Sequence, residues 1–449
     1  MFIRTTYYRV MIPAVALGIL LGGLAAISGQ TTGSGLFSPT SMQEVTVEGL
    51  RVRLGQPVQV TAQIGWEVGW PQFMGKHAFT HLTPALARFP QGELIGTYTL
   101  DPDTQSNPVF VSGFQISKDG GAHWGRRYSL LMQHIAVIFL PKPNDSLMAL
   151  PSEMYQETPG DEHNFRGPYY LFEHGGDRMV MVPDGVRVVG WPWPAEVYSS
   201  PQPRENWHAG VILTGNALSI NGKLLATGYF QKKGEKTTSA IILSSTDGGY
   251  TWRYLSTVAG PDPALVSQRS YEGADEMSMI QLADGDLMAV FRVGSGRKWN
   301  LRRAYSHDEG RTWSKPDVLP AWSVDPQLVR TANGTIALST GRPGISLWLS
   351  TDPRGTNWKQ IDIAAHHNGC VTDPRERINS FEINPSPYLS ETTRWQTSSY
   401  TGLVEVAPNR LILLYDRVPE GPPVDDHDLS RAYVLPIELE PGSNSGNKP

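Results

Sequence analysis

Three side chains that can transfer protons or act as nucleophiles stand at the same distance before a turn. Glu276, Asp325 and Tyr400 each lie nine residues before a Gly or Asn of a predicted tight turn, and Thr83 stands at the equivalent place before an earlier turn. Carboxyl and phenol groups at equivalent places of a repeated structure would converge on one site. There they could serve as acid, base or nucleophile.

Two arginines follow the same turns. Arg292 lies seven residues after Gly285, and Arg342 lies eight residues after Gly334. On the returning strand of a hairpin these distances lead back to the end where Glu276 and Asp325 stand. Guanidinium groups bind carboxylates through two parallel hydrogen bonds. The spacing therefore predicts a site of carboxylates, a phenol and guanidinium groups assembled from separate stretches of the chain.

The turns themselves form a repeated set. Each consists of Gly or Asn between two apolar runs, and Asn-Gly or Asp-Gly in that setting is the strongest short hairpin pattern. The six copies are residues 89–94, 183–188, 221–224, 284–287, 333–336 and 408–411.

A second repeat follows the pattern Ser-x-Asp-x-Gly-x-x-Trp. It occurs at residues 117–124, 245–252 and 306–313, and with one inserted residue at 350–358. The Asp side chain can accept hydrogen bonds from turn amides, Gly supplies a positive φ, and Trp packs as an apolar plug. The repeating unit is thus a hairpin, a strand, a box turn and a fourth strand.

Six such units predict an all-β fold, a six-bladed β-propeller with four-stranded antiparallel blades over residues 43–440. The first strand, around residues 45–62, and the last, 433–439, would share a blade and close the ring. Residues 130–207 hold ten prolines and break the regular spacing. They are expected to form a degenerate blade with long loops.

The box pattern is the aspartate box, and with it the chain resembles the sialidase-like (BNR-repeat) β-propellers. The resemblance implies that Tyr400 is the nucleophile and Glu276 the base that activates it. It also implies that Arg292 and Arg342 hold the substrate carboxylate. Asp325, which the nine-residue spacing singles out, is a further candidate for substrate binding, with ordering of the turn before Pro326 as the alternative. A neutral phenol suits a substrate whose own carboxylate would repel a carboxylate nucleophile, and sialidases are exceptions to the two-carboxylate rule.

The sequence departs from the family pattern at one place. The family's first arginine lies two residues before a proline, and here Leu82 precedes Pro84 in that way. Arg88, Arg166 or Arg417 could replace it. The general acid of the family is an aspartate in the loop that follows, which would be Asp103 or Asp101.

Histidines leave a second chemistry open. His81 stands beside the missing arginine, and similar propellers include enzymes that use histidine and arginine on rhamnose–glucuronate linkages. His174 and His208 are more typical of surface or core positions, and His366 and His367 are expected in a polar loop. No spacing of His and Cys argues for zinc, and no cofactor is expected.

The ends of the chain have their own compositions. Residues 1–28 combine arginines, an apolar run and a small-residue cleavage site, which predicts a secretory signal peptide, with an uncleaved membrane anchor as the alternative. Residues 29–42 read as a flexible linker and 441–449 as a disordered tail. The single cysteine, Cys370, excludes an intramolecular disulfide. These features predict a secreted or periplasmic protein.

The function expected from these patterns is exo-acting hydrolysis of a terminal acidic sugar, sialic acid by default, from a glycan. Another propeller carbohydrate enzyme acting on uronate- or rhamnose-containing polysaccharide, or a non-catalytic glycan-binding propeller, are the alternatives. A net charge of −5 without basic clusters argues against a nucleic-acid partner. A monomer without a membrane contact after signal cleavage is expected.

Overall fold

A computed structural model describes residues 43–47, 49–62, 81–101, 111–131, 138–158, 160–195, 198–199, 208–235, 237–260, 273–293, 300–341, 344–378, 397–418 and 430–441. Residues 36–449 form one compact unit. Strands dominate the described residues, so the all-β prediction is confirmed. The segments predicted as signal peptide and linker lie outside the described residues, as does the tail beyond residue 441.

Three sheets have four antiparallel strands each, in chain order from inside to outside. The first contains β4 (His81–Arg88), β5 (Leu94–Asp101), β6 (Val111–Ser117) and β7 (Tyr128–Leu131). The second contains β18 (Met277–Gln281), β19 (Leu287–Phe291), β20 (Arg302–Ser306) and β21 (Asp317–Val318). The third contains β22 (Gln327–Arg330), β23 (Ile336–Gly341), β24 (Ile345–Ser350) and β25 (Lys359–Asp362).

A ten-stranded sheet occupies residues 139–259. One group of four consists of β8 (Phe139–Lys142), β9 (Ser146–Ala149), β11 (Phe165–Glu173) and β12 (Arg178–Val188). The other consists of β14 (His208–Ile220), β15 (Lys223–Gln231), β16 (Thr238–Ser245) and β17 (Thr251–Ala259). The remaining two strands are β10 (Glu153–Gln156) and β13 (Tyr198–Ser199), both paired with β14.

The two groups of four do not separate, which differs from the prediction of six independent blades. β10 pairs with both β11 and β14. On the outside, β12 runs parallel to β17, with Arg187 opposite Thr251 and Val188 opposite Trp252. Backbone hydrogen bonds therefore continue from one group into the next, and the described strands form five sheets.

The last sheet joins the two ends of the fold. It contains β1 (Gln43–Val47), β2 (Leu50–Leu54), β3 (Val58–Ala62), β26 (Gly402–Ala407), β27 (Arg410–Arg417) and β28 (Arg431–Pro441). β28 pairs with β27 along one edge and with β2 and β3 along the other. The early strands thus share a sheet with the last strand, as expected for a closed ring.

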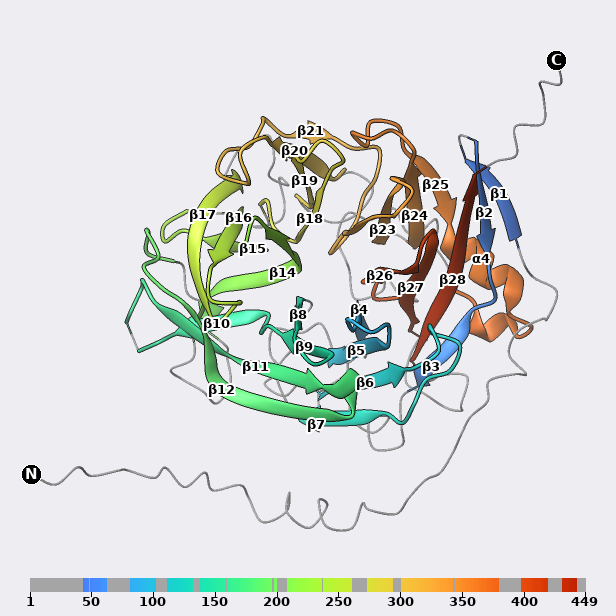
Figure 1. Cartoon of the computed structure of the whole chain (residues 1–449), viewed down its shortest axis with the longest axis horizontal. Helices are drawn as coiled ribbons and strands as arrows, with labels where there is room; N and C mark the ends of the chain where they lie inside the picture. Colours follow the sequence, from blue (N-terminus) through green and yellow to red (C-terminus); the bar gives the residue numbers. More distant parts are fainter. Residues whose placement is uncertain are drawn as a thin grey trace, which may run out of the picture. The chain divides into compact units, whose positions relative to one another are not determined.

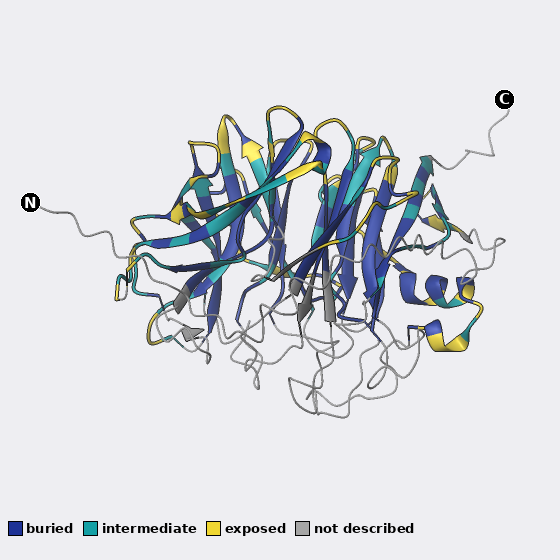
Figure 2. Cartoon of the chain, turned by 90° about the horizontal axis from the view of Figure 1, so that it is seen from below, coloured by how far each residue is buried: buried dark blue, intermediate teal, exposed yellow. Residues whose placement is uncertain are grey.

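Within the unit the sheets follow one another around a centre (Figure 1). The first strands are neighbours in the order β14, β18, β22, β26 and β4. Strands β7, β17, β21 and β25 lie outside (Figure 1). Buried residues run along the strands, and exposed residues gather at the turns (Figure 2).

The hydrophobic core lies between neighbouring sheets. One cluster joins Leu225 and Ile242 to Met279 and Phe291 of the next sheet. Another joins Met288 and its neighbours to residues of β23 and β24, and a third joins the closing sheet to β4 and β5. Because each sheet buries both of its faces, β-branched and aromatic residues occupy both sides of the strands.

The aspartate boxes have the predicted mechanics. In the second box, Ser245 Oγ donates to Asp247 Oδ1 (2.8 Å), and the amides of Gly249 and Thr251 donate to Ser245 Oγ and Asp247 Oδ1 (both 2.9 Å). Trp252 Nε1 donates to the Gly249 carbonyl at 2.8 Å and so closes the turn. Equivalent bonds occur at residues 117–124 and 306–313. Each box joins the third strand of a group to the fourth.

Five of the six predicted hairpins join a first strand to a second strand. The prediction at residues 183–188 is wrong: Asp184 has a φ of 55° within β12, where the pairing with β11 shifts by a bulge. The hairpin of that group is at Asn144 and Asp145, with φ of 58° and 52° between β8 and β9. Two left-handed residues in succession suit a two-residue hairpin, and Asn and Asp tolerate them.

A helix interrupts the strands after β25. α4 (Ile363–Cys370) begins at Asp362, whose Oδ1 accepts from the Ala365 amide (2.9 Å). Two 3₁₀ helices, η1 (His174–Gly176) and η3 (Pro374–Glu376), are also present in the described chain. Within those same ranges, none of the helices has both the length and the apolar character that a membrane span requires.

Candidate active site

The predicted convergence of side chains from separate sheets is present. Glu276 immediately precedes β18, and Asp325 and Tyr400 each lie two residues before β22 and β26. Since these first strands are neighbours around the centre, their starting ends meet on one side of the unit. Thr83 lies in β4, the next first strand in the ring, and its side chain is outside the described part of the structure.

Glu276 is the centre of the cluster. Its Oε1 accepts a hydrogen bond from Tyr400 Oη at 2.8 Å. Its Oε2 accepts from Arg292 Nη1 at 2.6 Å and from the backbone amide of Asp325 at 2.7 Å. One carboxylate oxygen is therefore directed at the phenol, while the other is fixed by a guanidinium and a main-chain donor. The side chain of Glu276 is 14% exposed, so the group can still be reached from solvent.

Arg292 lies between two carboxylates. Its guanidinium contacts Glu276 and also Asp275, with 3.5 Å between Arg292 Nε and Asp275 Oδ1. The backbone repeats the pairing, because the Arg292 amide donates to the Glu276 carbonyl at 3.1 Å. Both Arg292 and Asp275 are buried. Such a pair in a poorly solvated site holds its geometry firmly, since separating the charges would leave each one buried alone.

Asp325 is buried, and its two carboxyl oxygens are engaged by protein groups. Thr214 Oγ1 donates to Oδ1 at 2.9 Å, and Gln327 Nε2 donates to Oδ2 at 2.9 Å. Burial, and then the charge of Glu276, raise the pKa of Asp325 to about 7. The carboxyl predicted to bind substrate thus faces Thr214 of β14 and Gln327 of β22, and it is the amide of Asp325 that contacts Glu276.

Hydrogen bonds to the buried Asp416 fix the turn that precedes Tyr400. Asp416 of β27 accepts from Thr397 Oγ1 and from the Ser398 amide, both at 2.8 Å. Ser399 adopts a φ of 68°, and its amide donates to Thr397 Oγ1 at 2.9 Å. A left-handed non-glycine residue persists only where surrounding contacts fix it. The turn is therefore rigid immediately before the phenol.

The remaining predicted residues are only partly covered. Asp103 and Arg342 lie outside the described residues. His81, Leu82 and Asp101 lie in β4 and β5, and only their backbone is described. His208 starts β14, likewise as backbone only, and His174 lies in η1.

Three arginines were suggested as replacements for the missing one, and two of them, Arg88 and Arg166, lie elsewhere in the fold. Arg88 ends β4 at the hairpin, opposite the end where His81 stands, and Arg166 of β11 pairs with Asp184 at 3.2 Å. Arg417 is buried and engaged by Glu376, with 3.9 Å between Arg417 Nη1 and Glu376 Oε2, and by the carbonyl of Arg375.

The expectation that His366 and His367 lie in a polar loop is wrong. Both are buried in α4. His367 Nδ1 lies 3.0 Å from Tyr415 Oη, and its Nε2 lies 3.0 Å from the Glu376 carbonyl. Burial lowers the pKa of His367 to about 4. A neutral histidine packed on Tyr415 belongs to the core.

Thr214, Asp275 and Asp416 were missed in the sequence. Asp275 adjoins Glu276 and could have been found by asking which neighbour balances Arg292. Thr214 lies eight residues before Gly222, one place away from the nine-residue spacing, in a stretch where the pairing of β14 with β15 shifts between Leu213 and Ala217. Asp416 stands inside an apolar strand, where a buried carboxylate is a signal of a hydrogen-bonding task.

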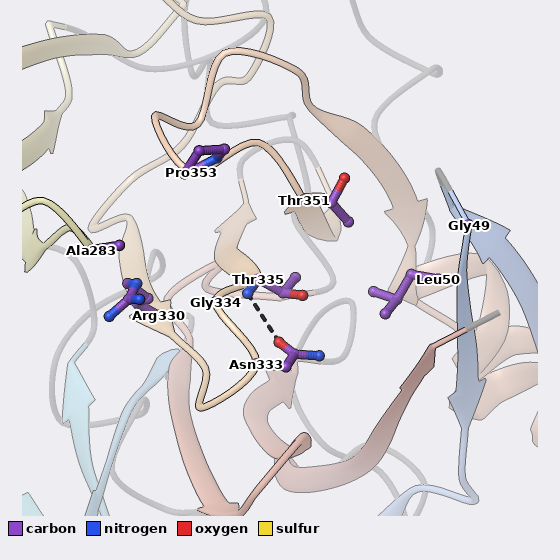
Figure 3. A pocket seen from close by; sticks show the side chains of 9 residues that line it. All are labelled: Gly49, Leu50, Ala283, Arg330, Asn333, Gly334, Thr335, Thr351 and Pro353. Atoms are coloured by element: carbon purple, nitrogen blue, oxygen red, sulfur yellow. Dashed lines mark hydrogen bonds between the residues drawn. The ribbon is translucent and has the colours of Figure 1, made fainter.

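Among the described residues, no group of three or more His, Cys, Asp or Glu side chains could hold a metal ion. A hollow of about 480 Å³ lies at the hairpin ends of β18–β19 and β22–β23 (Figure 3). Thr335 donates its amide to Asn333 Oδ1 at 3.0 Å there, and Arg330 stands at the rim (Figure 3). This hollow holds none of the residues that surround Glu276.

The ring of sheets and the aspartate boxes are similar to those of the sialidase-like β-propellers with BNR repeats. Residues 189–398 match the family model of the BNR repeat-like domain. This match agrees with the resemblance inferred from the boxes.

Solved structures share the fold at low sequence identity. A protein of unknown function from Dyadobacter fermentans is 17% identical, with a TM-score of 0.55 over 88% of this chain and 100% of its own. The Hadza microbial sialidase Hz136 is 14% identical, with a TM-score of 0.53 over 86% of this chain and 68% of its own. An alpha-L-arabinanase of Penicillium chrysogenum is 15% identical, with a TM-score of 0.50 over 86% and 98%. No curated protein matches.

Proposed function

We propose that the protein is an exo-acting glycoside hydrolase in which Tyr400 is the nucleophile and Glu276 its base. The observation that supports this is the 2.8 Å hydrogen bond from Tyr400 Oη to Glu276 Oε1. A free phenol has a pKa near 10 and needs an adjacent base to attack at neutral pH. Glu276 meets that need because its second oxygen is already fixed, leaving Oε1 to receive the proton.

In the first step, the phenol proton moves to Glu276 as Tyr400 Oη forms a bond to the anomeric carbon. The glycosidic bond breaks, and the leaving oxygen takes a proton from a general acid, for which Asp103 is the candidate from the sequence. In the second step, water attacks the anomeric carbon. Its proton goes to the general acid site, and Tyr400 leaves with the proton that Glu276 received.

The substrate proposed is a glycan ending in an acidic sugar, with sialic acid as the default. A neutral phenol is not repelled by a carboxylate on the reacting carbon, whereas a carboxylate nucleophile would be. Arg292, together with Arg342, would bind that carboxylate. The phenol at Tyr400 is thus the feature that favours an acidic sugar.

One observation favours a second candidate, hydrolysis of a neutral terminal sugar. Arg292 already contacts both Asp275 and Glu276, so two protein carboxylates balance its charge. Leu82 also replaces the family's first arginine. A site with fewer unbalanced cations holds a carboxylate less well. The fold shared with an arabinanase is compatible with this alternative.

Turnover of fluorogenic glycosides tests the proposal. The parent, Tyr400→Phe and Glu276→Gln would be assayed on a sialoside, a glucuronide and an arabinofuranoside, with Tyr250→Phe as control because Tyr250 is exposed on a box turn. We expect both site variants to lose on the order of 10⁴-fold in kcat, as when an essential nucleophile or base is removed, and the control to match the parent. A parent that cleaves only the arabinofuranoside would favour the neutral sugar. A parent that cleaves none of the three would contradict the proposed activity.

The proposal extends to organisation and location. The two groups of four within the ten-stranded sheet would count as two blades, giving six in all. Residues 1–28 would direct export to the periplasm or the medium, where a monomer would meet its glycan. Mass spectrometry of the exported protein would test this, and a mature form that still begins at Met1 would contradict signal cleavage.

A further inference from the structure

We propose that Asp325 is a positioning residue that fixes the base of the proposed glycosidase, acting through its backbone amide and held by Thr214 of another sheet. This inference rests on the proposed function for its kinetic consequences. Its geometric part stands on contacts that the sequence repeat does not explain.

The Asp325 amide is one of two donors to Glu276 Oε2, at 2.7 Å, and Arg292 is the other. Two donors on one carboxylate oxygen fix its rotation, so Oε1 must point to Tyr400. A base that transfers a proton needs this fixed distance, because a misplacement of about 1 Å can cost 10²-fold in rate. The amide therefore contributes to orientation without touching the substrate.

The Asp325 amide donates to Glu276 from a backbone conformation that is rare for residues other than glycine. Asp325 has a φ of 38°, in the left-handed region, and it precedes Pro326, which favours extended conformations in the residue before it. A non-glycine residue in this region is strained and keeps this conformation only where surrounding contacts hold it. Asp and Asn tolerate the region better than alanine does.

Side-chain contacts hold this conformation. Thr214 Oγ1 and Gln327 Nε2 donate to the two oxygens of Asp325, each at 2.9 Å. Thr214 lies 111 positions earlier in the chain, in β14, and thus connects a fourth sheet to the cluster. Thr214 lies in the stretch where the pairing of β14 with β15 shifts, between Leu213 and Ala217. Asp325 is 2% exposed. Its carboxyl group is therefore enclosed by the protein, where these two hydrogen bonds stabilise the backbone conformation.

If the hydrogen bonds to the Asp325 carboxyl position Glu276, variants at these residues should rank in a specific order of kcat. Asp325→Asn keeps the shape, the tolerance for a positive φ and an acceptor for Thr214, and we expect a kcat within about threefold of the parent. Asp325→Ala removes the carboxyl group that accepts from Thr214 and Gln327, and we expect kcat to fall by about 10²-fold with KM within about twofold. Thr214→Val removes one donor from a different strand, and we expect a fall in kcat of roughly tenfold with the same KM.

The experiment measures kcat and KM of these three variants on the substrate that the parent cleaves, with thermal melting to confirm folding. Crystal structures of the parent and Asp325→Ala add a readout that needs no turnover, the distance between Glu276 Oε1 and Tyr400 Oη. We expect that distance to lengthen in the variant. Thr214→Val keeps the test valid if Asp325→Ala does not fold.

The outcomes separate the two proposals. A parent without turnover contradicts the proposed function alone, and the crystal structures then decide the positioning role. Asp325→Asn as impaired as Asp325→Ala would show that the charge itself is required, which overturns a positioning role. An active parent with unchanged kcat in both Asp325→Ala and Thr214→Val, or an unchanged distance to Tyr400, overturns it as well.

Discussion

Glu276 shows how much of this site depends on hydrogen bonds to one side chain. Its two oxygens receive a phenol, a guanidinium and an amide from three different segments of the chain. The nine-residue spacing was sufficient to predict that Glu276, Asp325 and Tyr400 meet, because equal numbers of residues separate them from equivalent hairpins. The spacing could not predict which way each group points. That depends on the positive φ of Asp325 and Ser399, which no periodicity encodes.

Asp325 gives a pH dependence of stability with a definite sign. Its pKa is raised from 3.8 to about 7 by burial and by the charge of Glu276, which Arg292 partly offsets. Between these values the folded state holds a proton that the unfolded state has lost. The free energy of unfolding therefore falls as pH rises from about 4 to 7, by on the order of a few kcal/mol at most.

Asparagine at position 325 removes this titration. We expect the stability of Asp325→Asn relative to the parent to rise between pH 4 and 7 and then to level off, as measured by urea unfolding at several pH values. Asp308→Asn is a matched control of opposite sign, because hydrogen bonds from Thr312 lower the pKa of Asp308 to about 2. A relative stability of Asp325→Asn that does not change with pH would show that Asp325 ionises normally in the fold.

At the scale of elements, the box turns were predictable because every contact within them is local. Ser, Asp, Gly and Trp lie within eight residues, so the sequence alone defines the geometry. α4 was not predicted, although Asp362 is a recognisable N-cap before two alanines. Its stability depends on partners far away in the chain: Glu376, buried just after it, pairs with Arg431 at 2.7 Å. The ten-stranded sheet was missed for the same reason, since β10 pairs across two groups.

The boxes allow a prediction within one repeat. Asp247 accepts from Ser245 Oγ and from the amides of Tyr250 and Thr251. Asp352, in the box with an inserted residue, accepts from the amides of Arg354 and Thr356 and from the Thr356 side chain, whereas Ser350 Oγ donates to the backbone carbonyl of Asp352. The part-buried contact from Ser245 Oγ therefore distinguishes Asp247 from Asp352. Because a hydrogen bond to a charged group contributes about 1.5–3 kcal/mol, we expect Asp247→Ala to lower the melting temperature more than Asp352→Ala does. Differential scanning calorimetry would measure both, and an equal decrease would show that the contact from Ser245 adds nothing.

At the scale of the whole molecule, closure of the ring depends on strands from the beginning of the described chain. β2 and β3 pair with β28 through residues such as Val52 opposite Leu439, and Val52, Leu54 and Val60 are buried there. The sequence predicted this closure from the position of its first and last apolar runs. Without β2 and β3, β28 would expose an unpaired edge and apolar side chains, which favours association.

A pair of truncations tests this closure. A protein that begins at residue 43 keeps all three strands, whereas one that begins at residue 64 lacks them. We expect the first to unfold cooperatively and to elute as a single species. We expect the second to lose a cooperative transition or to aggregate, because two core clusters that include Val52 and Val60 would be opened. Calorimetry and size-exclusion chromatography measure these outcomes. If both proteins melted at the same temperature, the other sheets would close the ring on their own, and the site around Glu276 would not depend on β2 and β3.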